Sequence, residues 1–87
     1  TEFALAQNYP NPFNPTTKID FKLKQSGLTT LKVYDMLGRE VETLVNGELQ
    51  AGSYQVDFDG RGLASGVYFY RLNSGSFVET KKMMVTK

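Results

Sequence analysis

Lys18–Leu23 (KIDFKL) decides the fold class of this chain of 87 residues. Its apolar side chains, Ile19, Phe21 and Leu23, alternate strictly with charged ones. Successive side chains of a β-strand point to opposite faces of the sheet, so the alternation predicts a strand with one face buried and the other in solvent.

All three prolines lie just before this strand, in the run Asn8–Thr17 (NYPNPFNPTT). Proline fixes its own φ, lacks the N–H that a sheet ladder needs, and biases the residue before it towards an extended conformation. The run therefore predicts a stiff, irregular segment that leads into a β domain. Before it, the short apolar stretch Phe3–Gln7 is expected to form an edge strand.

After Leu23, glycine and asparagine turns separate further segments of the same period. We expect these strands at Leu28–Asp35, Glu40–Val45, Ser53–Asp59, Val67–Leu72 and Phe77–Val85. Val67–Leu72 is apolar on both faces, which favours a central position. Gly38 is expected in one tight turn and Asn46-Gly47, a strong hairpin signal, in another.

About seven strands, with turns every 8–12 residues or so, predict an all-β fold, an Ig-like antiparallel β-sandwich. A small barrel is the alternative. The sequence shows no helical period longer than one turn, and we expect no internal repeat. Tyr68, near the start of the penultimate strand, is a candidate for a tyrosine corner.

Composition narrows the class of protein. Eighty-seven residues suffice for one small domain, and the absence of cysteine excludes disulfides and thiolate ligands. Ten basic and nine acidic residues argue against a nucleic-acid surface. No apolar run approaches the ~20 residues of a membrane helix, and no signal peptide is visible. Because the first residue is Thr1, we expect a domain cut from a longer chain.

Few residues could carry catalysis. Without histidine or cysteine, nucleophile–base pairs and zinc sites lack their main components. Asp57 and Asp59 are expected on a solvated strand face rather than across a cleft. Asp57–Gly60 resembles the start of a calcium loop, but the bidentate glutamate position falls on Tyr68. We therefore expect no enzyme, cofactor or metal site.

Five segments together are similar to a known family. They are NYPNPFNPTT at 8–17, VYDMLGREV at 33–41, LQAGSY at 49–54, GLASGVYFYRL at 62–72 and KKMMVTK at 81–87. In this order they closely resemble the type A C-terminal sorting domain of cargo proteins of the type IX secretion system. That domain is related to the Ig-like domain of flagellar hook-capping proteins. The resemblance covers nearly the whole chain.

The resemblance implies a domain that is a ligand and a substrate rather than an enzyme. Such domains direct a cargo, after transit through the periplasm, across the outer membrane to the cell surface or the medium. An outer-membrane shuttle protein binds the domain, and a sortase-like cysteine protease removes it. We expect this domain, monomeric, over residues 9–87, with residues 1–8 as a linker or first edge strand from an upstream cargo domain.

The motifs of the family fall on eight residues of this chain. They are Pro10, Asn11 and Pro12, then Gly52 and Tyr54, and finally the basic residues Lys81, Lys82 and Lys87. The prolines would hold the junction with the cargo extended, and Gly52 would permit a tight turn before Tyr54. The lysines would leave a charged final strand that a partner extends or grips. Each residue is either recognised directly or needed for folding, and the lysines also suit an edge that blocks aggregation.

Two other functions remain as alternatives. The first is a structural Ig-like module of an extracellular protein or flagellar assembly. The capping proteins share the pattern Asp-x-x-Gly-Arg-x-Val, here Asp35, Gly38, Arg39 and Val41. The second is a carbohydrate-binding module, which needs a row of exposed aromatic side chains.

Overall fold

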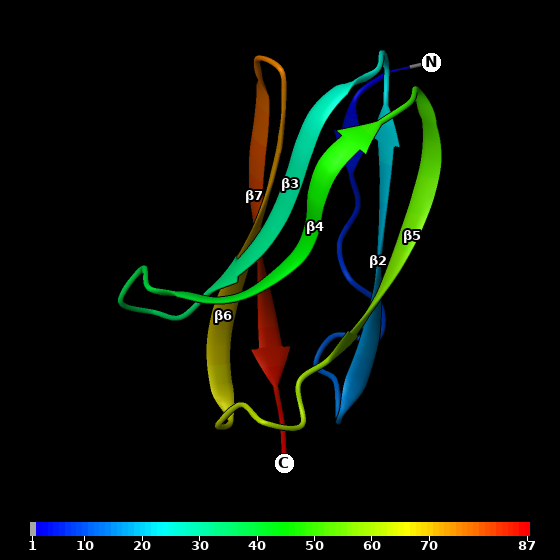
Figure 1. The fold of residues 1–87 in the computed structure, drawn as a ribbon. Coiled ribbons are helices and arrows are strands. Elements are labelled where there is room, and N and C mark those ends of the chain that lie inside the picture. Colours follow the sequence, from blue (N-terminus) through cyan, green and yellow to red (C-terminus); the bar gives the residue numbers. More distant parts are fainter. Residues whose placement is uncertain (1) are drawn as a thin grey trace.

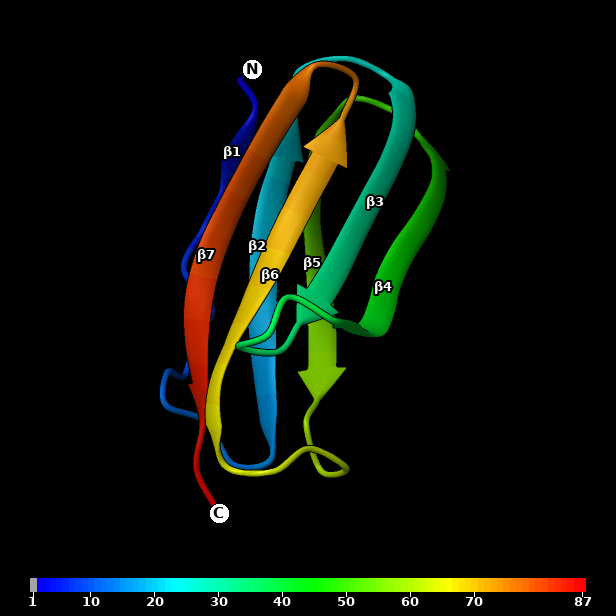
Figure 2. The ribbon, with the colours of Figure 1, turned by 90° about the vertical axis from the view of Figure 1, so that its left-hand side faces the viewer.

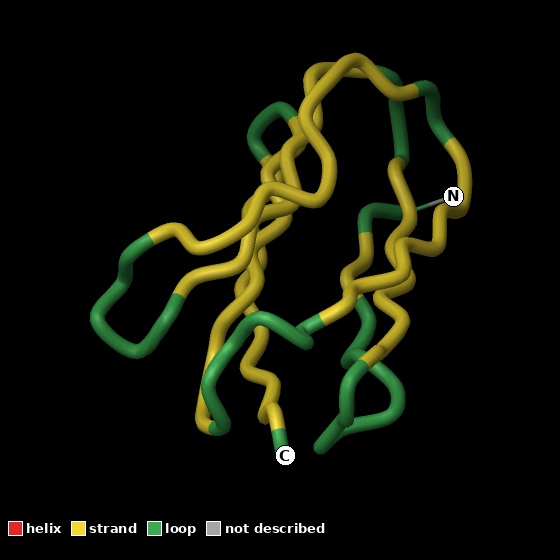
Figure 3. Tube along the Cα trace, turned by 60° about the horizontal axis from the view of Figure 1, so that its bottom comes forward, coloured by secondary structure: helices red, strands yellow, loops and turns green. Residues whose placement is uncertain are grey.

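A computed structural model describes residues 2–87, which form two antiparallel sheets packed as a sandwich (Figure 1). The seven strands are β1 (Ala4–Leu5), β2 (Thr16–Leu23), β3 (Gly27–Tyr34), β4 (Glu40–Leu49), β5 (Gly52–Asp59), β6 (Gly66–Ser74) and β7 (Phe77–Val85). The predicted sandwich of about seven strands is confirmed. The described residues are strands and loops throughout (Figure 3), so no helix among them could cross a membrane.

One sheet has the order β1-β2-β5, and the other has the order β4-β3-β6-β7 (Figure 2). β6 lies between β3 and β7, as its two apolar faces predicted. The chain changes sheet after β2, after β4 and after β5. As a result, β1 and β7 lie at one side of the sandwich, and β4 and β5 lie at the other.

Inward-facing side chains of both sheets make one core. On β2 these are Ile19, Phe21 and Leu23, each at most 2% exposed. The four-stranded sheet adds Leu31, Val33, Tyr70, Leu72, Met83 and Val85. Each large apolar side chain that is fully buried stabilises the fold by about 1.5–3 kcal/mol, so the alternation in the sequence is what holds the two sheets together.

The prediction of a hairpin turn at Asn46-Gly47 is wrong. Both residues lie inside β4, where Asn46 pairs with Thr30 and Gly47 with Thr29 of β3. After β4 the chain crosses to the other sheet instead of returning beside itself, so it needs no two-residue hairpin turn there. β4 is therefore longer than the predicted Glu40–Val45 and extends to Leu49.

The tight turn predicted at Gly38 is present between β3 and β4. Gly38 has φ +85°, a left-handed conformation that other residues adopt only with strain. In Figure 1 this turn projects away from the outer face of the four-stranded sheet. It is the most protruding connection on that face.

Candidate recognition site

Residues 6–13, which we call the strap, run beside β7 and close one side of the sandwich (Figure 2). The side-chain Nε2 of Gln7 donates a hydrogen bond of 2.7 Å to the carbonyl oxygen of Lys82. The backbone N–H of Met84 donates a bond of 3.0 Å to Oδ1 of Asn11. These bonds place the proline motif and the basic terminal motif side by side, although the sequence separates them by about seventy residues.

Phe13 anchors the end of the strap. Its N–H donates to the carbonyl oxygen of Met84, and its own carbonyl oxygen accepts the N–H of Thr86, each at 3.0 Å. The ring is 1% exposed and meets that of Phe58 edge to face at 5.9 Å. A Cβ at position 60 would lie 3.0 Å from this ring, so Gly60 allows the close approach.

A buried polar network fixes the path of the proline loop. Asn8 is 2% exposed, and its Nδ2 donates to Oγ1 of Thr17 at 3.0 Å and to the carbonyl oxygen of Pro10 at 3.2 Å. Thr17 Oγ1 donates to the same carbonyl oxygen at 2.8 Å, and Asn8 Oδ1 accepts from Gln7 at 2.7 Å. Because a buried polar group without a partner is costly, only a loop that completes this network is stable.

Tyr70 joins the strap to the four-stranded sheet. Its side chain is fully buried, and its hydroxyl donates to the carbonyl oxygen of Ala6 at 2.7 Å. The hydroxyl oxygen of Tyr70 also accepts a hydrogen bond of 2.8 Å from the backbone N–H of Asn8. Burial, with a smaller contribution from the charge of Glu79, raises the pKa of Tyr70 to about 12. The hydroxyl therefore stays neutral and can both donate and accept.

The three lysines of the terminal motif lie in different surroundings. Lys81 is half-buried on the inward side of β7, where its Nζ is 3.3 Å from a carboxylate oxygen of Glu79. Lys82 is exposed on the outward side. Lys87 lies beyond the strand and donates a bond of 2.6 Å to the carbonyl oxygen of Arg61. Of the three, Lys82 presents its charge most openly.

Gly52 and Tyr54 are not part of this site. Gly52 pairs with Leu23 at the far end of β2, whereas the strap joins the near end. Gly52 has φ +150°, and the Tyr54 hydroxyl donates to the carbonyl oxygen of Gln50 at 2.6 Å. The ring of Tyr54 stacks on that of Phe21 at 5.2 Å. The pair therefore builds the turn into β5.

A second turn of this kind, in which a tyrosine hydroxyl donates to a carbonyl oxygen four residues earlier, occurs at the start of β6. Tyr68 donates to the carbonyl oxygen of Ala64 at 2.8 Å, which confirms the predicted tyrosine corner, and Gly66 has φ +146°. Both turns have the pattern L-x-x-G-x-Y, at 49–54 and at 63–68. We expected no internal repeat, and this short one could have been found by aligning the two segments.

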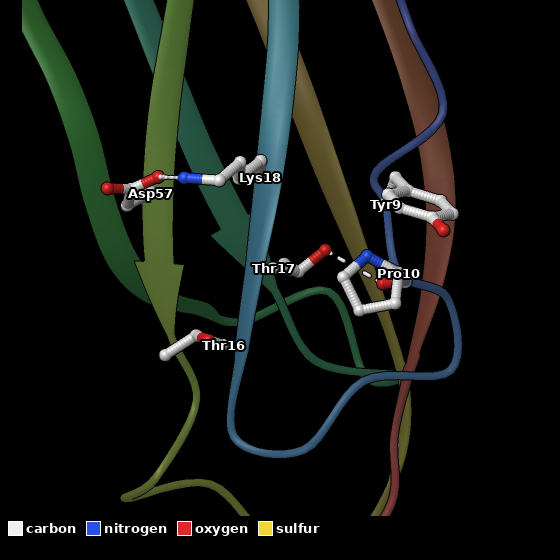
Figure 4. Close-up of a pocket in the computed structure, with 6 residues that line it drawn as sticks. All are labelled: Tyr9, Pro10, Thr16, Thr17, Lys18 and Asp57. Atoms are coloured by element: carbon white, nitrogen blue, oxygen red, sulfur yellow. Dashed lines mark hydrogen bonds and ion pairs between the residues drawn. The ribbon is translucent and has the colours of Figure 1, made fainter.

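A shallow cleft of about 390 Å³ lies beside the strap. Its lining residues are Tyr9, Pro10, Thr16, Thr17, Lys18 and Asp57 (Figure 4). Asp57 is paired with Lys18 at 2.8 Å, and the carboxylate of Asp59 is engaged by Arg61 at 3.3 Å. Residues 2–87 hold no cluster of three or more groups suited to a metal ion. The cleft offers a contact surface rather than reacting groups.

The sequence did not point to Asn8, Phe13, Thr17 or Tyr70 as parts of this site. The first three lie within the proline run or its end, and an asparagine between polar neighbours gives no sign of burial. Tyr70 sits in a strand whose apolar pattern predicts a core residue only. Its role arises because the fold brings β6 to the strap.

A family model described as the secretion system C-terminal sorting domain matches residues 7–86 of the chain. A search of curated proteins found none that matches the chain. The matched range contains nearly all of the strap and the whole of β7, so both halves of the site lie inside it.

Proposed function

Because the chain belongs to the family of type IX secretion system C-terminal sorting domains, we propose that an outer-membrane shuttle protein binds it and that a sortase-like protease then removes it. Membership of the family makes the domain a sorting signal, which implies contact with the secretion machinery and export to the cell surface or the medium. Domains of this family are generally not catalytic. Transit through the periplasm precedes the proposed recognition.

The contact between the strap and β7 supports this proposal most. It brings the exposed residues Pro10, Asn11 and Pro12 beside the terminal basic motif, so one partner can contact both. We propose that direct recognition uses Pro10, Asn11, Pro12, Lys81, Lys82 and Lys87. Gly52 and Tyr54 act by forming the turn into β5.

Recognition through side chains fits the site better than addition of a strand to β7. The N–H groups of Met84 and Thr86 already donate to the strap, so a partner strand would first have to displace it. The exposed Lys82 needs no such change to reach an acidic group of a partner. We therefore propose that the shuttle grips this side of the domain by charge and shape.

We also propose that the cargo precedes residue 9, with residues 1–8 as linker and first edge strand. Leu5 is 5% exposed, and the ring of Phe3 stacks on that of Phe77 at 5.0 Å. Proteases bind extended chains that are free of other contacts, and β1 is not free while it pairs with β2 and buries Leu5. The cut is therefore expected before Phe3.

Export of a reporter tests the proposed function. The 87-residue chain is fused to the C-terminus of a periplasmic reporter in a bacterium that has the type IX system. We expect the reporter on the cell surface or in the medium, and retention in the periplasm would refute the proposal. Deletion of residues 81–87 is unsuitable as the only variant, because it removes the core residues Met83 and Val85 as well.

Lys82→Glu separates recognition from folding, since Lys82 is exposed. We expect this variant to reduce export by about tenfold at an unchanged unfolding temperature. Lys22→Glu, the same charge change on the outward side of β2, is the control and is expected to export normally. Normal export of Lys82→Glu would show that this lysine is not recognised.

A further inference from the structure

The two outer faces of the sandwich differ in chemistry. On the three-stranded sheet, outward side chains are polar and pair with one another across β2 and β5. Lys18 lies 2.8 Å from Asp57, and Gln55 donates to Asp20 at 2.9 Å. Such a face is satisfied by its own contacts and by water.

The outer face of the four-stranded sheet carries exposed apolar side chains throughout, with bases over β6 and β7 that are unpaired among residues 2–87. In contrast, β4 adds Glu40, which pairs with Lys32 at 3.3 Å, and Glu48. Six large apolar side chains are exposed among residues 2–87, and five of these are on this face or on the turn above it. They are Leu28, Met36, Leu37, Val78 and Met84, at 62, 70, 78, 57 and 40% exposed. Clusters of exposed apolar side chains on a small domain mark interaction surfaces.

The charges on this face have one sign over β6 and β7. The outward residues of these two strands are Val67, Phe69, Arg71, Asn73, Val78, Thr80, Lys82 and Met84, which include two bases and no acid. The guanidinium of Arg71 lies 5.0 Å from the centre of the Tyr34 ring, and its Nε donates to Thr80 at 3.2 Å. Arg71 is thus held in place, but no acid of the described residues neutralises it.

The turn between β3 and β4 holds Met36 and Leu37 in solvent. The carboxylate of Asp35 accepts the N–H of Leu37 at 2.9 Å and the N–H of Arg39 at 3.0 Å. It also binds Nε of Arg39 at 2.8 Å, and these bonds lower the pKa of Asp35. A turn fixed in this way presents apolar side chains that lose little entropy on binding.

Met36 stands between two shallow clefts. One, of about 300 Å³, is lined on the sheet by Tyr34, Phe69 and Arg71. The other, of about 260 Å³, includes Val67 and Tyr68. The face therefore has relief as well as apolar surface, which suits a shaped protein partner.

We propose that this face is a second docking surface for the outer-membrane shuttle, whose complementary surface is apolar with acidic residues. The identity of the partner rests on the proposed function, whereas the chemistry of the partner follows from the face itself. A second copy of the chain fits poorly, because its acids on this face, among residues 2–87, are only Glu40, which Lys32 already pairs, and Glu48 at the opposite end of β4. An anionic membrane fits poorly too, since two free bases contribute only about 1 kcal/mol each.

Binding of the purified 87-residue chain to a purified type IX shuttle protein in detergent tests the proposal. We expect Met36→Gln with Leu37→Gln to raise Kd about tenfold or more, as loss of central apolar contacts does. Arg71→Glu is expected to raise Kd about tenfold by placing an acid opposite acids. Lys22→Glu on the other face is the matched control and should leave Kd unchanged.

Each other outcome overturns the docking surface in a distinct way. If the shuttle binds the wild type and both variants equally but loses affinity for Lys87→Glu, which lies beyond β7 and off this face, the proposed function stands and this surface is wrong. If the shuttle does not bind the wild type, both proposals fail. If the variants lose affinity only for vesicles of anionic lipid, the face is a membrane contact. If they only abolish self-association in gel filtration, it is a contact between copies.

The variants lie at exposed positions, and their thermal unfolding midpoints are measured alongside Kd. The turn variant and Arg71→Glu alter different strands or turns. A failure of one to fold therefore leaves the other as a complete test.

Discussion

The two lateral sides of the sandwich are protected by different means. At the side of β1 and β7, the strap covers the edge of β7 from Lys82 onward through contacts between residues about seventy positions apart. At the side of β4 and β5, the edges are left open (Figure 2). The register of β4 against β3 shifts twice there, and the exposed residues Glu40, Glu42 and Glu48 line the strand. Irregular, charged edges discourage pairing with other chains.

The comparison indicates that the contacts at the strap side depend on one another more than those at the side of β4 and β5. At the open side, the register shifts of β4 and its exposed glutamates are local features that do not depend on one another. The covered side depends on buried polar groups and on one aromatic anchor, which all act together. Substitutions at the covered side should therefore cost more stability than substitutions at the open side.

The largest difference is expected for the aromatic anchor. Phe13→Ala should lower the free energy of unfolding by about 3–5 kcal/mol, because it leaves a cavity against Phe58 and Gly60. Val41→Ala, on the partly buried side of β4, should cost about 1 kcal/mol. Denaturant unfolding of both variants measures the two values. Equal losses would show that the strap is not the more cooperative side.

The next largest loss of stability is expected for the buried side-chain amide of Asn8. Asn8→Ala leaves Thr17 and the carbonyl oxygen of Pro10 with fewer partners, at a cost of about 1–3 kcal/mol. Gln55→Ala removes an exposed hydrogen bond to Asp20 and should change stability by less than about 0.5 kcal/mol. If Asn8→Ala is as mild as its control, water replaces the amide and the network does not fix the loop.

The hydroxyl of Tyr70 should show its contribution through pH. The pKa of this hydroxyl is raised to about 12 in the folded state from 10, so the stabilisation is complete below pH 10 and is lost as the pH rises through about 12. Tyr70→Phe should cost about 0.5–1.5 kcal/mol at neutral pH and should lack this alkaline loss. Unfolding curves at pH 8 to 12 compare the two proteins, and identical declines would contradict the assignment.

The smallest effect is expected for the link between the two motifs. Asn11→Ala removes a single acceptor from the N–H of Met84 and should cost about 0.5–1 kcal/mol. Amide exchange at Met84 should become faster, while exchange at Val45 in β4 should not change. Uniform acceleration at both amides would mean that the link stabilises the whole sandwich rather than its covered side.

The alternation of apolar and polar side chains along the sequence was sufficient to predict most strands. β7 has the predicted bounds, and β2 and β5 differ from prediction by one or two residues at their starts. These strands have one face in the core, so burial alone specifies them. The hairpin signal at Asn46-Gly47 failed because the crossing to the other sheet, and not local turn chemistry, sets where β4 ends.

The candidate site was predicted only in part. Its motif residues came from a resemblance, which does not say which of them are neighbours. The structure brings Asn11 to Met84 and leaves Gly52 and Tyr54 at the far end of β2. The links through Asn8 and Tyr70 depend on how the chain folds back on itself, and no local pattern encodes that.

The strap also orders events in time. Residues 6–13 leave the ribosome roughly several seconds before residues 82–86, at the usual rates of synthesis. Until then Phe13 has neither of its backbone partners, Met84 and Thr86. A polypeptide that ends before these residues therefore cannot attach the strap to the edge of β7. The covered edge can therefore form only in a chain that has been synthesised through Thr86, so completion of this side of the fold reports completion of the chain as far as that residue.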